Sequence, residues 1–300
     1  MVGGRQATEK RNDRLVMRCY RYMKFEHAVQ SLQDNFFKVN RLSQFNDPFE
    51  CRARFINSCD VPALRKFVHM NFARLKSEAI RQTNSYTPDA QQRFTENLIF
   101  ERYLDSVKKH SPPVSEFDNI ILVMCLVNEK GLRSNSDILF WSHYADSGKG
   151  IRITFDLEMT PAASVYYMKK VRYSDFIPTF DMSLFEEWLQ GDDFKNFISD
   201  TVTTKGSAWN YENEVRMIIP LNLPVSFQYI TSREVNGAVL QFVKIGYDAI
   251  RRVDFGPRCN SAEANSLIND LKSNTDTKHI HFFKTTFHPE KYAYCYERVA

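Results

Sequence analysis

Two glutamates and an arginine form the pattern in this chain with the clearest chemical potential. Glu212 and Glu214 stand two residues apart before an apolar, β-branched run, and Arg216 follows two residues later. Alternate side chains of a strand share a face, so we expect all three on one face, which meets water or lines a cleft because unpaired buried charge is costly. Paired carboxylates can divide their work, one positioning a group and the other stabilising a developing cation, and Arg216 would keep both ionised. The alternative is a solvent-facing strand with cross-strand ion pairs.

A second group of side chains could hold a flat ligand. Trp141, His143 and Tyr144 lie at the end of a short helix that the pattern predicts over residues 137–144. Together they would offer a stacking surface with polar tips, which suits a ring-bearing ligand, and the histidine could exchange a proton near neutral pH. The alternative is a core tryptophan beside a hydrogen-bonded histidine.

The segment from Ser43 to Glu50 predicts a fixed turn. Pro48 biases Asp47 towards extended backbone angles, and Asn46 precedes it. The turn would present polar side chains and backbone donors at a defined place. It could equally be a capping turn after a strand.

Other reactive patterns are missing from the sequence. There is no P-loop, no dinucleotide fingerprint and no Gly-x-Ser-x-Gly elbow. His279 and His281 would share a strand face, but no third ligand stands at a helpful spacing. We therefore predict no metal site.

The composition is that of an ordinary globular protein with an aromatic-rich interior. The 300 residues suffice for one large domain or two small ones, and 24 Phe and 14 Tyr accompany only 10 Gly. This favours a thick mixed core over a glycine-rich nucleotide-binding sheet. The net charge is +4, and residues 1–24 carry seven Lys or Arg against two acidic residues. Such a start can attract phosphates or can be a solvated tail.

Targeting and redox signals point to a cytoplasmic protein. The six cysteines show no Cys-x-x-Cys spacing, and several lie in apolar runs, as reduced cysteines do. We expect no transmembrane helix, because no apolar run reaches 18 residues, and no signal-type apolar core follows the charged start.

The elements alternate between helix and strand without an internal repeat. The hydrophobic spacing predicts helices over 26–35, 137–144, 182–204 and 262–273, with a largely helical block over 61–110. It predicts strands over 15–22, 36–39, 120–126, 151–155, 165–173, 214–219, 226–231, 238–246, 253–257 and 279–285. We therefore predict a disordered basic lead over 1–13 and a single α+β domain over 14–300. That domain would hold a mixed, mostly antiparallel sheet and a helical insertion at about 60–115.

Five motifs together resemble a bacterial family, the domain of unknown function numbered 2971. They are Tyr20-Arg21-Tyr22, the turn from Ser43 to Glu50, the stretch from Trp141 to Asp146, Lys149-Gly150 leading to Phe155-Asp156, and the stretch from Trp209 to Arg216. They are spread over residues 15 to about 285. One departure is that Met23 occupies a place where the family often has an Arg. The family name carries no function.

The chain is also similar, more distantly, to ADP-ribosyltransferases. Those enzymes carry an Arg or His on a first core strand, a Ser or Tyr on a second and a Glu, often in Glu-x-Glu, on a third. Here the order would be Arg21, then Ser43 or the group around Trp141, then Glu212 and Glu214. The resemblance implies a split sheet of that type and NAD as a substrate.

The same resemblance implies a division of roles. The nicotinamide would stack on Tyr22 or Trp141, and Glu214 would hydrogen-bond the ribose and stabilise an oxocarbenium-like transition state. Glu212 would orient the acceptor, and basic residues would hold the pyrophosphate. The implied catalytic residues are Glu214, Glu212 and His143, and the implied binding residues are Arg21, Tyr22, Ser43, Asn46, Asp47, Trp141, Tyr144 and Arg216.

These resemblances imply an NAD-consuming transferase or glycohydrolase, and family association alone implies a toxin-like or phage-defence effector. The acceptor would be a nucleic acid or a protein, and a partner protein could restrain the activity. Two rival interpretations stay open. The basic start, the pI near 8.6 and the many Tyr and Phe also fit a nucleic-acid-acting protein, either a nuclease or a binding module. The same pocket could serve a non-catalytic nucleotide sensor.

Overall fold

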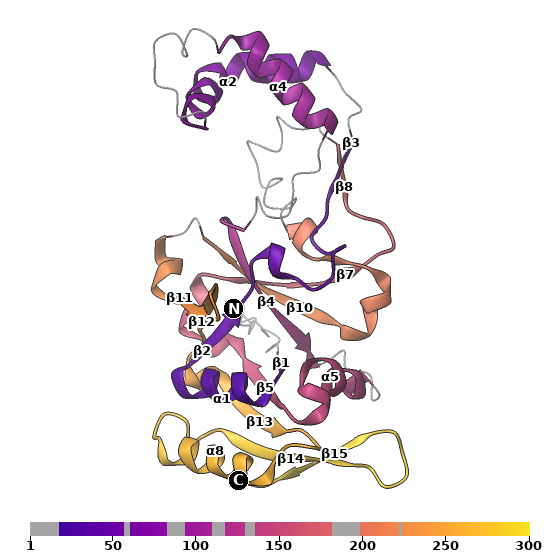
Figure 1. Cartoon of the computed structure of the whole chain (residues 1–300), viewed down its shortest axis with the longest axis vertical. Coiled ribbons are helices and arrows are strands. Elements are labelled where there is room, and N and C mark those ends of the chain that lie inside the picture. Colours follow the sequence, from indigo (N-terminus) through magenta and orange to yellow (C-terminus); the bar gives the residue numbers. More distant parts are fainter. Residues whose placement is uncertain are drawn as a thin grey trace, which may run out of the picture. The chain divides into compact units, whose positions relative to one another are not determined.

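The structure is a computed structural model that describes residues 18–56, 61–82, 94–109, 118–129, 136–181, 199–221 and 224–300. The predicted lead over 1–13 and most of the predicted helix over 182–204 lie outside these residues. The largest sheet has eight strands in the order β15-β14-β13-β5-β1-β4-β10-β6 (Figure 1). Strand β1 pairs antiparallel with β4 and β5, β5 with β13, β14 with β15, and β10 with β6. Strands β13 and β14 pair in parallel. The predicted α+β class with a mixed, mostly antiparallel sheet is confirmed.

The chain divides into two compact units. Unit 1 comprises Met1–Phe37, Leu126–Ser164 and Val243–Ala300, and unit 2 comprises Lys38–Cys125 and Val165–Phe242. Three strands have residues in both units: β2 (Phe36–Val39), β4 (Ile121–Asn128) and β12 (Ala238–Lys244). The predicted single domain stays a prediction.

Among its described residues, unit 1 has five strands and three α-helices, apart from its share of those three strands. They are β1 (Arg18–Met23), α1 (Phe25–Asp34), α5 (Ser136–Tyr144), β5 (Ile151–Asp156), β13 (Ile250–Phe255), α8 (Ser261–Ser273), β14 (His281–Phe287) and β15 (Tyr294–Arg298). Local chemistry sets the helix ends. Asn260 caps α8 by accepting hydrogen bonds from the N–H groups of Ala262 and Glu263, and Asn35 ends α1 in a left-handed conformation.

The register of β1, β5 and β13 places polar residues side by side within unit 1. Tyr22 of β1 and Asp254 of β13 both pair with Arg152 of β5. Strand β5 is otherwise an apolar, β-branched run, and Ile151, Ile153 and Phe155 are completely buried. The sheet therefore holds Arg152 between two neighbouring strands, among buried residues.

Unit 2 is built around β10 (Glu214–Pro220), which pairs with β6 (Tyr167–Lys170). In the part of unit 2 that the structure describes, the other α-helices and strands are β3 (Arg54–Ile56), α2 (Val61–Gln82), α4 (Glu96–Lys109), β7 (Arg172–Tyr173), β8 (Thr179–Asp181), β9 (Thr204–Lys205) and β11 (Ile230–Val235). Helices α2 and α4 share an apolar cluster of their own that includes Val68 and Phe100. The described parts of the predicted helical block thus contain two helices.

One predicted strand was wrong. Residues 226–231 do not form one strand, because Pro224–Gln228 forms a 3-10 helix and β11 begins only at Ile230. Strands β3, β8, β9 and β15 were not predicted. Among the residues that the structure describes, no helix is long and apolar enough to cross a membrane.

Candidate functional site

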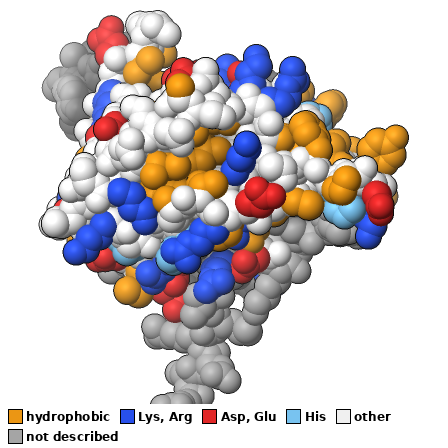
Figure 2. All heavy atoms as spheres, turned by 90° about the horizontal axis from the view of Figure 1, so that it is seen from below, with side chains coloured by type: hydrophobic (Ala, Val, Ile, Leu, Met, Phe, Trp, Pro, Cys, Tyr) orange, Lys and Arg blue, Asp and Glu red, His pale blue; other side chains and the backbone are white. Residues whose placement is uncertain are grey.

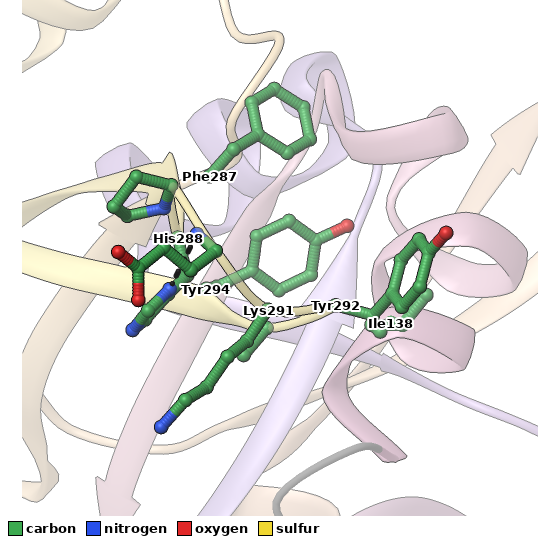
Figure 3. A pocket seen from close by; sticks show the side chains of 9 residues that line it. Ile138, Phe287, His288, Lys291, Tyr292 and Tyr294 are labelled. Atoms are coloured by element: carbon green, nitrogen blue, oxygen red, sulfur yellow. Dashed lines mark hydrogen bonds between the residues drawn. The ribbon is translucent and has the colours of Figure 1, made fainter.

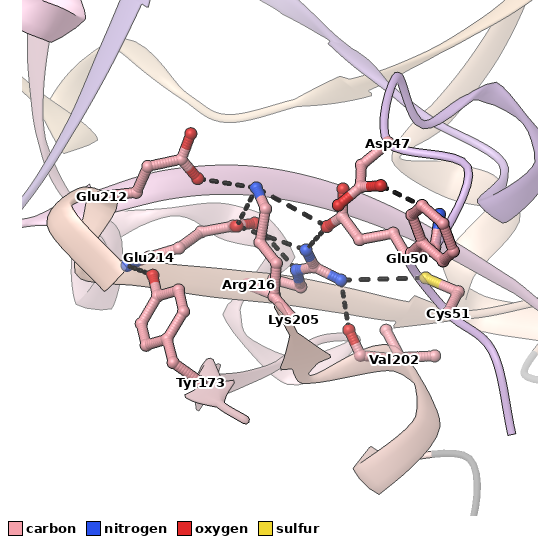
Figure 4. Close-up of polar contacts among 10 residues, drawn as sticks. Asp47, Glu50, Cys51, Tyr173, Val202, Lys205, Glu212, Glu214 and Arg216 are labelled. Carbon is pink, nitrogen blue, oxygen red and sulfur yellow. Dashed lines mark hydrogen bonds and ion pairs between the residues drawn. The ribbon is translucent and has the colours of Figure 1, made fainter. Parts of the chain in front are cut away.

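A cluster of charged side chains lies in the interior of unit 2. The glutamate cluster consists of Glu50, Lys205, Glu212, Glu214 and Arg216 (Figure 4). Lys205 Nζ lies 2.6 Å from Glu212 Oε2, 3.2 Å from Glu214 Oε2 and 3.7 Å from Glu50 Oε1. Arg216 Nε donates to Glu214 Oε1 at 2.8 Å, and its Nη2 pairs with Glu50 Oε1. Each of the five side chains is at most 6 % exposed.

The local backbone explains how the two predicted glutamates reach this cluster. Glu212 ends a 3-10 helix, Ser207–Glu212, and Asn213 follows in a left-handed conformation with φ 43°. Strand β10 begins only at Glu214, so its alternation puts Glu214 and Arg216, but not Glu212, on one face. The prediction of three charges on one strand face was therefore wrong for Glu212. The prediction that this face meets water or lines a cleft was also wrong. Glu214 and Arg216 are buried, and oppositely charged side chains are buried with them.

The pKa values of two glutamates in the cluster shift in opposite directions. Burial tends to raise the pKa of Glu214, but the charges of Arg216 and Lys205 and their hydrogen bonds outweigh it and lower this pKa to about 2. For Glu50 burial prevails over the attraction of Arg216 and Lys205, and the pKa is raised. Glu50 Oε2 is buried and has no hydrogen-bond partner among the described residues. One carboxylate is thus firmly ionised while its neighbour holds a proton more readily.

Both cations of the cluster stay charged. Burial tends to lower the pKa of Lys205, but Glu214, Glu50 and Glu212 raise it above its usual value. The pKa of Arg216 is likewise raised, since Glu214 outweighs desolvation. The cluster can therefore present fixed positive charge to an anionic group as well as a carboxylate to a cation.

Two half-buried aromatic rings lie beside the cluster. Lys205 Nζ is 4.7 Å from the centroid of the Trp209 ring, and the Trp209 and Tyr211 centroids are 6.2 Å apart. Both rings remain partly exposed, in contrast to the charged groups next to them. Tyr173 fixes the start of β10 by accepting a hydrogen bond from the Glu214 N–H at 2.8 Å. The structure therefore offers a stacking surface at Trp209 and Tyr211 that the sequence interpretation did not assign.

The predicted turn serves the cluster through its last residue, Glu50. Asp47 accepts a hydrogen bond from the Phe49 N–H at 2.9 Å, and Ser43 donates to Asp118. Asn46 is exposed. The turn thus matches its capping alternative, and its contribution is to carry Glu50 into the cluster.

The predicted ring-binding residues Tyr22, Trp141, His143 and Tyr144 lie in unit 1, and the first two belong to its core. Trp141 is 0 % and Tyr22 7 % exposed. The Tyr22 ring stacks on Phe140 with centroids 5.1 Å apart and meets Trp141 edge-on at 5.1 Å. The prediction that Trp141 or Tyr22 offers a stacking face to a ligand was therefore wrong, because neighbouring rings already cover both. His143 is exposed and Tyr144 half-buried.

Unit 1 has a buried polar cluster of its own around Arg152. This arginine cluster comprises Tyr20, Tyr22, Asp137, Arg152, Asp254 and Tyr296. Arg152 Nε lies 3.0 Å from Asp254 Oδ2, and its guanidinium carbon lies 4.7 Å and 4.3 Å from the ring centroids of Tyr20 and Tyr296.

Two further hydrogen bonds of the arginine cluster meet on the first turn of α5. Asp137 accepts hydrogen bonds from the hydroxyls of Tyr22 at 2.7 Å and Tyr296 at 2.6 Å. The cluster joins β1, β5, β13, β15 and α5, which is a structural role. Arg21, beside it in sequence on β1, is half-buried.

The predicted site residues thus separate by unit. Arg21, Tyr22, Trp141, His143 and Tyr144 belong to unit 1. Ser43, Asn46, Asp47, Glu212, Glu214 and Arg216 belong to unit 2. The predicted pocket common to both groups stays a prediction. Across the described ranges, no group of three or more His, Cys, Asp or Glu could hold a metal ion.

Comparisons with known proteins point to one family. Neither the curated proteins nor the solved structures gave a match. The model of a family described as a protein of unknown function (DUF2971) matches residues 140–217, a span that includes Arg152, Lys205, Glu212, Glu214 and Arg216. Over this segment, shorter than the span of the motifs, the predicted resemblance to the DUF2971 family is confirmed.

Proposed function

We propose that the glutamate cluster cleaves the N-glycosidic bond of NAD and passes the ADP-ribosyl group to water or to an acceptor. The observation that carries this proposal is the pairing of Glu214, with a pKa of about 2, and Glu50, with a raised pKa, on the same lysine and arginine. Carboxylates whose pKa values are pushed apart are the usual means by which one site stabilises a cation and moves a proton.

Each group has a step in this reaction. As the bond between ribose C1′ and the nicotinamide nitrogen breaks, its electron pair leaves with the nicotinamide, which becomes neutral. The ionised Glu214 stabilises the oxocarbenium-like ribose that forms. Oxygen of water or of an acceptor hydroxyl then bonds to C1′, with Glu212 orienting it, and its proton passes to Glu50. Lys205 has the fixed charge to attract the pyrophosphate.

The aromatic pair beside the cluster supports a ring-bearing substrate. Trp209 and Tyr211 both precede Glu212 in the same 3-10 helix and remain partly exposed, so a nicotinamide could stack there. Glu214 is only 5 % exposed, so the proposal requires the turn Ser207–Glu212 to open when substrate enters. A 3-10 turn is a suitable hinge, because its hydrogen bonds are weaker than those of an α-helix.

We also propose that the protein is cytoplasmic. The described cysteines Cys19, Cys51, Cys125, Cys259 and Cys295 are free thiols. Free thiols persist in a reducing compartment, which supports a cytoplasmic location.

The decisive experiment measures nicotinamide release from NAD by the purified chain. Glu214→Gln should abolish release, while Glu234→Gln, the same change at an exposed glutamate of unit 2, should leave it unchanged. Thermal unfolding of both variants shows whether the first variant is folded. Absence of nicotinamide release by the unaltered chain would refute the proposal.

A second variant tests the site without removing any of the buried charged groups. Trp209→Ala removes the stacking surface, worth roughly 1–3 kcal/mol per ring, so KM for NAD should rise about tenfold or more while kcat changes less. Phe227→Ala removes an aromatic side chain that is 62 % exposed in unit 2 and serves as the matched control. Equal KM values for the two variants would show that NAD does not stack at Trp209.

A further inference from the structure

A cavity in unit 1 lies at the hairpin that joins β14 to β15. It has a volume of about 540 Å³ and is lined by Ile138 of α5 and by residues 287–294 of the hairpin (Figure 3). Pockets for small molecules usually measure roughly 300–1,000 Å³ and combine apolar walls with a few polar groups. The size is therefore that of a site for a ligand no larger than a nucleotide.

The hairpin backbone is held in one shape. The His288 N–H donates to the Ala293 carbonyl at 2.9 Å, and the Ala293 N–H donates to the Lys291 carbonyl at 2.8 Å. The Glu290 N–H donates to His288 Nδ1 at 3.1 Å, which ties the His288 side chain to the hairpin backbone. A preformed loop loses little conformational freedom when a ligand binds, which favours affinity.

Aromatic rings form the apolar part of the lining. Phe287 is 64 % exposed, and its ring centroid lies 5.8 Å from that of Tyr294. Tyr292 is 93 % exposed, and it lines the cavity together with Ile138 (Figure 3). The face seen in Figure 2 carries several groups of hydrophobic side chains with Lys and Arg between them. Exposed rings gathered around a cavity mark a place where a planar ring can stack.

The polar groups of the cavity include one cation and one carboxylate. Lys291 is exposed, and its side chain forms no ion pair with any residue in the described ranges. Glu290, its neighbour, also lines the cavity. An ammonium attracts a phosphate, and a carboxylate accepts hydrogen bonds from sugar hydroxyls or an exocyclic amine. The rings can stack on a base, the ammonium can attract a phosphate and the carboxylate can bind sugar hydroxyls. The lining therefore offers a partner for each of the three parts of a nucleotide.

We propose that this cavity binds a mononucleotide, with the base against Phe287, Tyr292 and Tyr294 and the phosphate on Lys291. The site lies within unit 1 and uses no residue of the glutamate cluster. The proposal is therefore independent of NAD cleavage, and it stands even if the chain does not act on NAD.

Isothermal titration calorimetry of the full chain tests the proposal. The probes are AMP, GMP, CMP and UMP, with adenosine and inorganic phosphate as separate arms. At least one mononucleotide should bind, and the matching nucleoside and phosphate alone should each bind more weakly. Failure of all four mononucleotides to bind at millimolar concentration would overturn the proposal.

Variants then locate the binding site. Tyr292→Ala and Lys291→Glu should each weaken binding about tenfold, which corresponds to ~1.4 kcal/mol. The exposed Tyr292 and Lys291 side chains can be changed without opening the core. Lys278→Glu, an exposed lysine of unit 1 outside the cavity, and Trp209→Ala should leave binding unchanged. Unaltered binding by the first two variants, or its loss in Trp209→Ala alone, would overturn the assignment.

Discussion

The depressed pKa of Glu214 predicts a specific acid sensitivity of the fold. A carboxylate whose pKa is lower in the folded than in the unfolded chain stabilises the fold above its unfolded pKa, and this contribution is lost as the pH falls. For Glu214 the ordinary value is 4.5 and the folded value is about 2. The contribution at neutral pH is (4.5 − 2) × 1.36, or about 3 kcal/mol.

Most of this contribution should disappear within a range that can be measured. The linkage relation gives a loss of about 2 kcal/mol between pH 7 and pH 3, because the unfolded Glu214 takes up its proton first. Glu50 acts in the opposite direction, since its raised pKa makes its charged form costly in the fold. The total pH dependence therefore does not isolate Glu214, but a comparison with Glu214→Gln does.

The assay is urea unfolding followed by circular dichroism at a series of pH values. Glu214→Gln should be less stable at neutral pH, because Lys205 and Arg216 lose a buried partner, but its free energy of unfolding should fall about 2 kcal/mol less towards pH 3. Glu234→Gln should follow the unaltered chain. Parallel curves for Glu214→Gln and the unaltered chain would refute the inference that Arg216 and Lys205 hold Glu214 ionised.

Two further predictions concern unit 1. Arg152→Met should lower the free energy of unfolding by about 3 kcal/mol in urea unfolding, because the buried Asp254 loses its ion pair with Arg152 and keeps only the one with the more exposed Arg252. Arg152→Lys should cost less, and equal losses would argue against a charge effect. Gly150→Ala should cost about 1–3 kcal/mol, since its new methyl group would lie 2.1 Å from the Met23 carbonyl oxygen. Gly237→Ala, with φ at +77° and nothing within 4 Å, should lose only the roughly 1–2 kcal/mol of backbone strain, and a larger loss there would contradict the steric argument.

Elements whose residues repeat with a regular period could be predicted from the sequence. Strand β5 was expected at 151–155 and spans Ile151–Asp156, and α1 was expected at 26–35 and spans Phe25–Asp34. Strand β15 has no such signal, because it is a strand only through its pairing with β14. The residues after Pro224 have the sequence pattern of a strand, but Pro224–Gln228 forms a 3-10 helix.

The candidate site was predictable only where its residues are close in sequence. The spacing of Glu214 and Arg216 placed them on one face of β10, as the structure has them. The prediction that Glu212 shares this strand face was wrong, because the left-handed backbone of Asn213 interrupts the alternation of side chains before β10 begins. Lys205 and Glu50 reach the cluster from other segments of the chain. A local sequence pattern cannot predict a buried ion pair between residues that are distant in sequence.

The alternation of the chain between the two units has a consequence for how it folds during synthesis. Unit 1 receives its final segment, Val243–Ala300, only after all of unit 2 has been made. Arg152 meets Asp254 across 102 residues and Tyr296 across 144, so these two contacts close late. Contacts between residues so far apart close large loops and slow folding. A ribosome that stalls before residue 243 would therefore hold a chain whose Arg152 has Asp137 as a partner but lacks Asp254, and chaperones and proteases can recognise such an incomplete core.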